Sequence, residues 1–155
     1  MPTKKAPFAS LHVQPLEPRL APSAGLETFD TTPVGSLPSG WSQWSGNGSA
    51  AFAVSAARSL SAPNGLAVSA GISTLAARSW LNGAGSADVQ VGAAVYLDTL
   101  IPAQLIARGT GLGTAAPSYY ALSLTRGLQA QLVRVTGGTA TTLATLASSA
   151  WFSDH

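Results

Sequence analysis

The chain has 155 residues and a formal net charge of +2, and only 9% of its residues are charged. Residues 26–155 hold five arginines and five carboxylates, so the body of the protein is neutral and lacks the basic patch by which proteins bind nucleic acid. Zero cysteines exclude a disulfide scaffold and a thiol nucleophile, and no apolar run approaches the ~18 residues of a membrane span.

Residues 1–25 are predicted to be a disordered tail. They contain five prolines and no hydrophobic stretch of the ~7–15 residues found in an ordinary signal peptide. Such a sequence buries too little apolar surface to offset its ordering entropy. We therefore expect residues 26–155 to form the domain, which has a length sufficient for a substantial core.

Short strand patterns alternate with turn signals after residue 26. The segment 88–98 has the clearest alternation, because Val and Leu share one parity over eleven residues. The tripeptide Asn47-Gly48-Ser49 matches a glycosylation sequon, but we interpret it as a turn. The segments predicted as strands before residue 110 lie around 52–54, 66–68, 75–81, 88–98 and 104–108.

Residues 119–147 predict three further strands joined by two-residue turns. Tyr120, Leu122 and Leu124 share a parity that assigns them to the core face, whereas Tyr119 is expected to face outward. The turns are predicted at Arg126-Gly127 and Gly137-Gly138, because glycine supplies the positive φ of tight hairpins. The apolar parity switches after Leu132, which predicts either a β-bulge or a strand covered on both faces. The whole pattern favours an all-β, antiparallel β-sandwich.

Several segments together resemble the concanavalin A-like lectin/glucanase superfamily, in particular its laminin-G-like jelly rolls. They are Glu27-Thr28-Phe29-Asp30, Leu37-Pro38-Ser39-Gly40-Trp41, Leu105-Ile106-Ala107-Arg108 and Tyr119-Tyr120-Ala121-Leu122-Ser123-Leu124. The resemblance implies two antiparallel sheets with ligands on a concave face, although this fold hosts lectins, hydrolases and inert modules alike. Because residues 151–155 fall where the family enters another strand, we expect residues 26–155 to be the N-terminal part of a jelly roll that is incomplete at its C-terminal end.

The tail carries a second resemblance. Residues 16–23, Leu-Glu-Pro-Arg-Leu-Ala-Pro-Ser, resemble the Leu-Glu-Pro-Arg motif at the start of many planctomycete surface or exported proteins. The resemblance implies a bacterial protein that is extracellular or bound to the cell surface. The alternative is a proline-broken linker.

No catalytic constellation is predicted. Asp88 and Asp98 would lie ~33 Å apart at the two ends of one strand, whereas a retaining glycosidase needs carboxylates ~5 Å apart. His12 lies in the tail and His155 is the last residue, so neither is expected to serve a catalytic triad. We therefore expect a protein that is not an enzyme.

A calcium ion is an expectation that follows from the family resemblance. Several members of the superfamily hold calcium near the first strand, and Asp30 is the matching residue. Calcium takes six to eight oxygen ligands, and the sequence does not identify the others. The alternative is a surface aspartate without a metal, and no cofactor is predicted beyond this calcium candidate.

A glycan is the predicted ligand. Sugars stack on aromatic rings while arginine and amide groups bind their hydroxyls. The residues that would suit such a platform are Arg78, Trp80, Tyr96, Arg108, Tyr119, Gln129 and Gln131. The alternative is that these aromatics pack between sheets, and Trp41 and Trp44 are expected to cover one end of the sandwich.

The function predicted from the sequence is that of a non-catalytic, exported carbohydrate-binding or adhesive module of a larger surface protein. The alternatives are a purely structural spacer and an accessory domain of a glycoside hydrolase whose catalytic part lies outside this chain.

Overall fold

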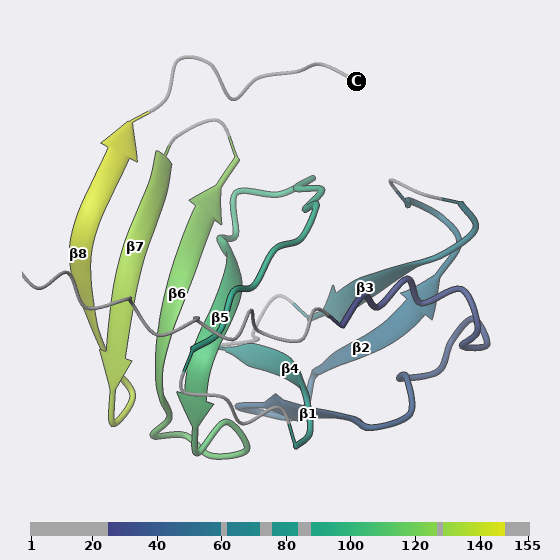
Figure 1. Ribbon diagram of the computed structural model, residues 1–155, viewed down its shortest axis with the longest axis horizontal. Coiled ribbons are helices and arrows are strands. Elements are labelled where there is room, and N and C mark those ends of the chain that lie inside the picture. Colours follow the sequence, from purple (N-terminus) through teal and green to yellow (C-terminus); the bar gives the residue numbers. More distant parts are fainter. Residues whose placement is uncertain (1–24, 60–61, 72–75, 84–87, 127–128, 148–155) are drawn as a thin grey trace, which may run out of the picture.

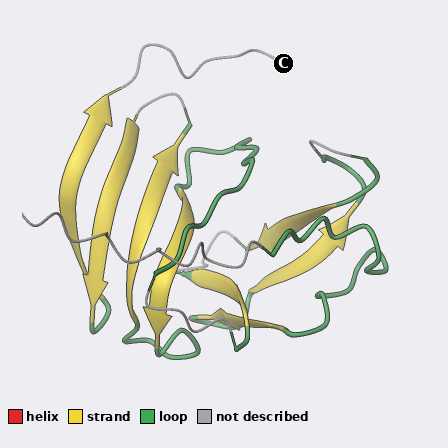
Figure 2. Cartoon of the chain, in the orientation of Figure 1, coloured by secondary structure: helices red, strands yellow, loops and turns green. Residues whose placement is uncertain are grey.

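The computed structural model describes residues 25–59, 62–71, 76–83, 88–126 and 129–147. Eight strands and no helix occur within these ranges (Figure 1, Figure 2). All strand pairs are antiparallel, so the predicted all-β antiparallel sandwich is confirmed. Residues 1–24 of the predicted tail, Gly127 of the predicted Arg126-Gly127 turn and the C-terminal residues 151–155 lie outside the described residues. The export-type motif and the incomplete jelly roll stay predictions.

Four consecutive strands form one curved sheet (Figure 1). They follow one another in sequence order, as expected for a meander, and β7 and β8 are joined by the predicted glycine turn, whose φ values are 56° at Gly137 and 84° at Gly138. The strands are β5 (Ala103–Thr110), β6 (Ser118–Thr125), β7 (Gln129–Thr136) and β8 (Thr139–Ala147).

The preceding half of the chain forms two separate strand pairs. One consists of β1 (Trp41–Ser45) and β4 (Ala77–Leu81), and the other of β2 (Ala50–Ser55) and β3 (Gly65–Ala70). In Figure 1 these pairs lie on the β5 side of the four-stranded sheet, away from β8. The sequence patterns around 52–54, 66–68, 75–81 and 104–108 therefore predicted β2, β3, β4 and β5.

The two faces of the four-stranded sheet differ in composition. In the ladders Leu105 stands opposite Leu122, and Leu122 stands opposite Leu132. Leu146 of β8 lies on the same face, which we call the leucine face. Ala130 is buried on the leucine face, whereas the other four buried side chains of the sheet lie on the opposite face, which we call the valine face. They are Ala121, Ser123, Val133 and Val135.

The prediction that Tyr120 and Leu122 face the core is wrong. Tyr120 is 41% exposed, whereas the neighbouring Ala121 is 2% exposed. Period-two alternation groups side chains by face, but it does not determine which face another layer of the protein covers. The predicted irregularity after Leu132 does occur as a register shift, with the extra residue, Leu143, in β8.

The predicted strand at 88–98 is also wrong. The described backbone of this segment joins no ladder and runs as an irregular stretch past β5 (Figure 1). Alternation requires a neighbouring strand before it becomes a β-ladder, and the three small residues at 92–94 offer little side-chain surface for packing. The distance that we assigned to Asp88 and Asp98 along a strand therefore loses its basis.

Candidate functional site

Arg78, one of the predicted ligand-binding residues, lies inside the fold. It is 7% exposed, and its guanidinium carbon sits 4.1 Å from the centre of the Trp44 ring. Its Nη2 donates a hydrogen bond of 2.7 Å to the carbonyl oxygen of Thr114. Burial lowers the pKa of Arg78, and a hydrogen bond with Tyr119 acts against that shift. Arg78 therefore ties β4 to the loop between β5 and β6.

Tyr119 lies on the valine face and is half-buried, so the expectation that it faces outward is wrong. Its hydroxyl group donates to Oε1 of Gln104 at 3.1 Å and interacts with Arg78. Trp80 is also half-buried, with its ring against Gly113. The structure thus brings three predicted site residues together, but as a packing cluster around the β5–β6 loop.

The remaining predicted residues lie apart from this cluster. Tyr96 is exposed on the irregular segment, where the Arg58 guanidinium covers its ring at 4.4 Å. Arg108 is exposed at a register shift of β5, with a φ of 56°. Gln129 and Gln131 are half-buried on β7, and Nε2 of Gln131 donates to the Thr145 hydroxyl at 3.5 Å. The seven predicted residues therefore do not share one surface.

The two tryptophans of β1 have separate partners. Trp44 lies beneath Arg78, whereas Trp41 packs edge-to-face against Phe29 with a centroid separation of 5.7 Å. Both side chains are half-buried. They anchor β1 to its neighbours and leave no open aromatic platform on this strand.

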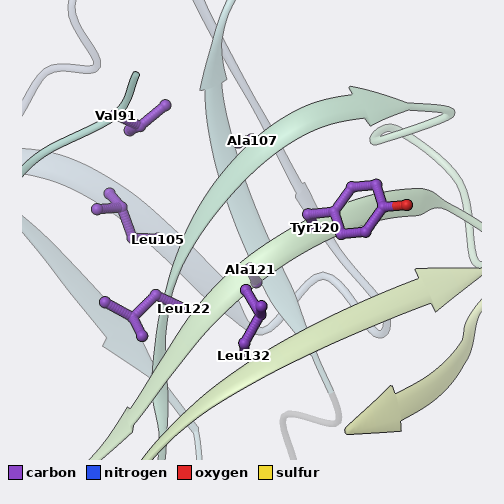
Figure 3. Close-up of a pocket in the computed structure, with 7 residues that line it drawn as sticks. All are labelled: Val91, Leu105, Ala107, Tyr120, Ala121, Leu122 and Leu132. Carbon is purple, nitrogen blue, oxygen red and sulfur yellow. The ribbon is translucent and has the colours of Figure 1, made fainter. Parts of the chain in front are cut away.

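The open surface of the four-stranded sheet is a shallow apolar groove of about 170 Å³ on the leucine face (Figure 3). Tyr120 and Leu132 project from adjacent strands, and Val91 from the irregular segment lies above Leu105. The residues lining the groove are Val91, Leu105, Ala107, Tyr120, Ala121, Leu122 and Leu132.

Polar groups adjoin the tyrosine end of this groove. Tyr120 pairs with Arg134, and Arg134 pairs with Thr141, so the three side chains follow one another across β6, β7 and β8 on one face. Arg134 and Thr141 are both exposed. The sequence pattern did not predict this row, because the parity of Tyr120 with Leu122 and Leu124 assigned it to the core. The predicted Gly137-Gly138 turn could have identified two of its three residues, because the register that a two-residue turn imposes on the flanking strands pairs Arg134 with Thr141.

The chemistry of the row is that of a recognition surface, and it offers no acid–base pair. A tyrosine ring provides a stacking surface, and the guanidinium and hydroxyl groups provide hydrogen bonds. No carboxylate belongs to the row or lines the groove. The arrangement suits non-covalent recognition of an amphipathic molecule.

Asp30, the calcium candidate, accepts a hydrogen bond from the loop that precedes β3. Its Oδ1 accepts a hydrogen bond of 3.4 Å from the backbone nitrogen of Asn64, and the Asn64 side-chain amide donates to the carbonyl oxygen of Phe29 at 3.4 Å. In the described part of the chain, no group of three or more histidine, cysteine or acidic residues gathers around a common point. Calcium binding at Asp30 stays a prediction.

Within the described ranges there is no helix of the length and apolarity that crossing a membrane would require. Comparisons with protein-family models, curated proteins and solved structures find no match to this chain. The resemblance to concanavalin A-like domains stays a prediction, and the candidate surface is argued from the geometry of this chain alone.

Proposed function

We propose that the protein is a non-catalytic binding module of an exported bacterial surface protein, and that the leucine face near Tyr120 binds glycan. The observation that carries this proposal is the open apolar groove with an exposed tyrosine beside an arginine and a threonine. The proposal keeps the ligand class expected from the sequence and moves its site from Tyr119 to the neighbouring residue.

The chemistry of sugars supports this choice. A pyranose ring has an apolar face that stacks on an aromatic side chain, while its hydroxyl groups need donors and acceptors at the rim. Arg134 supplies several donors, and Thr141 supplies one donor and an acceptor. Because residues 26–155 are electrically neutral, a neutral polysaccharide is favoured over a polyanion.

Adhesion to a protein is a second candidate, which a different observation favours. Away from Arg134 and Thr141, the leucine face is apolar out to β8, where Leu146 is 61% exposed, and contiguous exposed apolar surface marks interaction sites. All nine residues of β8 are exposed, and none is charged or a proline. Edge strands without such protection are prone to pair with another chain.

Affinity for immobilised neutral polysaccharides tests the glycan proposal. We expect Tyr120→Ala and Arg134→Ala each to weaken binding by ~1–3 kcal/mol, the range for a well-placed contact at the centre of an interface. Tyr96→Ala is the matched control, because Tyr96 is an exposed aromatic outside the groove and should leave binding unchanged. Melting curves of all three variants check that the fold is retained.

The outcomes separate the candidate functions. Absence of binding to every polysaccharide, or equal losses for Tyr120→Ala and Tyr96→Ala, would contradict the glycan proposal. Concentration-dependent self-association that Leu132→Glu abolishes would instead support apolar adhesion. A monomer that binds neither polysaccharide nor protein would support the function of a purely structural spacer.

A further inference from the structure

Every asparagine in this chain precedes a glycine. The three pairs are Asn47-Gly48, Asn64-Gly65 and Asn82-Gly83. In such a pair the backbone nitrogen of the second residue can attack the side-chain amide carbon of the asparagine, and glycine has no side chain to hinder the approach. The three sites share this local chemistry, so differences in their surroundings should determine which of them reacts.

Asn47 has the most unusual surroundings. It lies in the turn between β1 and β2, where Gly48 has a φ of 69°. Its Oδ1 accepts hydrogen bonds from the Ser49 hydroxyl at 2.7 Å, the Ser49 backbone nitrogen at 3.3 Å and the Ser45 hydroxyl at 3.5 Å. Three donors therefore converge on one exposed amide oxygen.

This arrangement favours attack by Gly48 on Asn47. The contact between Oδ1 and the Ser49 nitrogen closes a ring that contains the Gly48 nitrogen, so the Asn47 side chain is folded back toward its attacker. Attack transfers negative charge to Oδ1, which is the atom that the three donors surround. The Gly48 amide is itself held only by a long hydrogen bond of 3.3 Å to the Ser45 carbonyl oxygen.

We propose that Asn47 is a site of spontaneous deamidation and isoaspartate formation, and that the folded structure accelerates its conversion. A bond forms between the Gly48 nitrogen and Asn47 Cγ, and the bond from Cγ to Nδ2 breaks. Nδ2 leaves as ammonia, which takes up the proton that the Gly48 nitrogen loses. Water then opens the cyclic imide at either carbonyl, giving aspartate or isoaspartate without any redox change.

The surroundings of Asn64 should slow its conversion, in contrast to those of Asn47. Its backbone nitrogen and its side-chain nitrogen bond to Asp30 and to the Phe29 carbonyl oxygen, and its side chain is half-buried. Gly65 lies in the β2–β3 ladder opposite Ser55. A ladder residue cannot turn its nitrogen toward the preceding side chain without breaking the pairing, so Asn64 should be the slowest site.

Asn82 is the neutral reference among the three. Its backbone nitrogen donates to the Gly40 carbonyl oxygen at 2.8 Å, and its side chain is exposed. Among the residues that the structure describes, none makes a hydrogen bond to the Asn82 side chain. It therefore has neither the three donors of Asn47 nor the restraint of Asn64, and should convert at an intermediate rate.

The location of Asn47 gives its conversion a structural effect. The turn that contains it connects the β1–β4 pair to the β2–β3 pair. Deamidation adds a carboxylate to a domain with no net charge, and an isoaspartyl linkage inserts an extra carbon into the backbone of this connection. Ageing of the protein should therefore first alter how these two strand pairs are joined.

Peptide mass mapping of the full chain during incubation in mildly alkaline buffer tests the proposal. In the folded protein we expect Asn47 to convert several-fold faster than Asn82 and Asn64 to convert slowest. In concentrated urea, where only local sequence remains, the three rates should converge. Native conversion of Asn47 that is no faster than that of Asn82, or no faster than its own conversion in urea, would overturn the proposal.

Variants at Ser49 identify the cause of the acceleration. Ser49→Ala removes the shortest hydrogen bond to Oδ1 and should slow Asn47 several-fold, whereas Ser49→Thr retains the hydroxyl group and should preserve the fast rate. The rate at Asn82 serves as an internal reference and should not change. An Asn47 rate that is the same in Ser49→Ala as in the original chain would show that the hydroxyl has no role.

Discussion

The C-terminal sheet and the N-terminal strand pairs are built by different means. The strands from β5 to β8 have eight or nine residues and follow one another along the chain, whereas those from β1 to β4 have five or six, and β1 pairs with a strand that begins only at Ala77. Long neighbouring ladders supply many backbone hydrogen bonds to the meander. The short pairs depend more on individual side-chain contacts, such as that of Arg78 with Trp44.

The largest expected effect concerns that contact. Arg78→Ala should lower the free energy of unfolding by about 3 kcal/mol, because it removes a buried cation–π contact and leaves the Thr114 carbonyl without its donor. Arg58→Ala removes a cation–π contact on the exposed Tyr96 and should cost less than about 1 kcal/mol. Urea unfolding measures both, and equal losses would show that the buried contact does not anchor the N-terminal half.

Neighbouring residues of β7 compare the two faces of the meander. Val133→Ala should destabilise the protein by about 2 kcal/mol, because Val133 is 5% exposed. Leu132→Ala removes more carbon atoms but should cost only about 1 kcal/mol, since that side chain is already 45% exposed in the folded protein. A larger loss for Leu132 in urea unfolding would mean that the leucine face is covered in solution.

The glycine turn between β7 and β8 gives a smaller contrast. Both glycines have positive φ, so alanine at either position should cost about 1 kcal/mol through backbone strain. A Cβ at Gly138 would also lie 3.0 Å from the Ala115 carbonyl oxygen, whereas one at Gly137 would meet nothing within 4 Å. We expect Gly138→Ala to cost about 1 kcal/mol more in thermal unfolding. Equal melting temperatures would argue against close contact between this turn and the β5–β6 loop.

Amide hydrogen exchange should show the smallest difference between the C-terminal sheet and the N-terminal strand pairs. The amides of β6 and β7 lie in ladders on both sides, whereas β1 and β4 each have a single partner strand within the described residues. We expect the central strands of the meander to exchange most slowly, because they open only with the whole sheet. Slower exchange in β1 than in β6 would reverse our view of which half is more stable.

Sequence reasoning identified the elements whose causes are local. Gly137-Gly138 predicted its turn because two adjacent positive φ values are a property of glycine itself, and alternation predicted β6 and β7 with their correct side-chain grouping. It failed where distant partners decide the outcome. The burial of Arg78 depends on Thr114, which is 36 residues away, and the exposure of Tyr120 depends on which layer covers its face. The segment 88–98 has strand periodicity but no paired neighbour.

The pairing of β1 with β4 also affects the order in which the molecule can assemble. The hairpin of β7 and β8 closes over two residues, whereas β1 and β4 must close the whole segment 46–76, and the entropic cost of closure rises with loop length. Hairpins form within microseconds, so the meander should precede the N-terminal pairs during refolding. On the ribosome the order of emergence is opposite to this order of folding, because β1 emerges long before Thr114, whose carbonyl oxygen accepts the Arg78 hydrogen bond. The half of the molecule that is synthesised first should therefore be the last to become native.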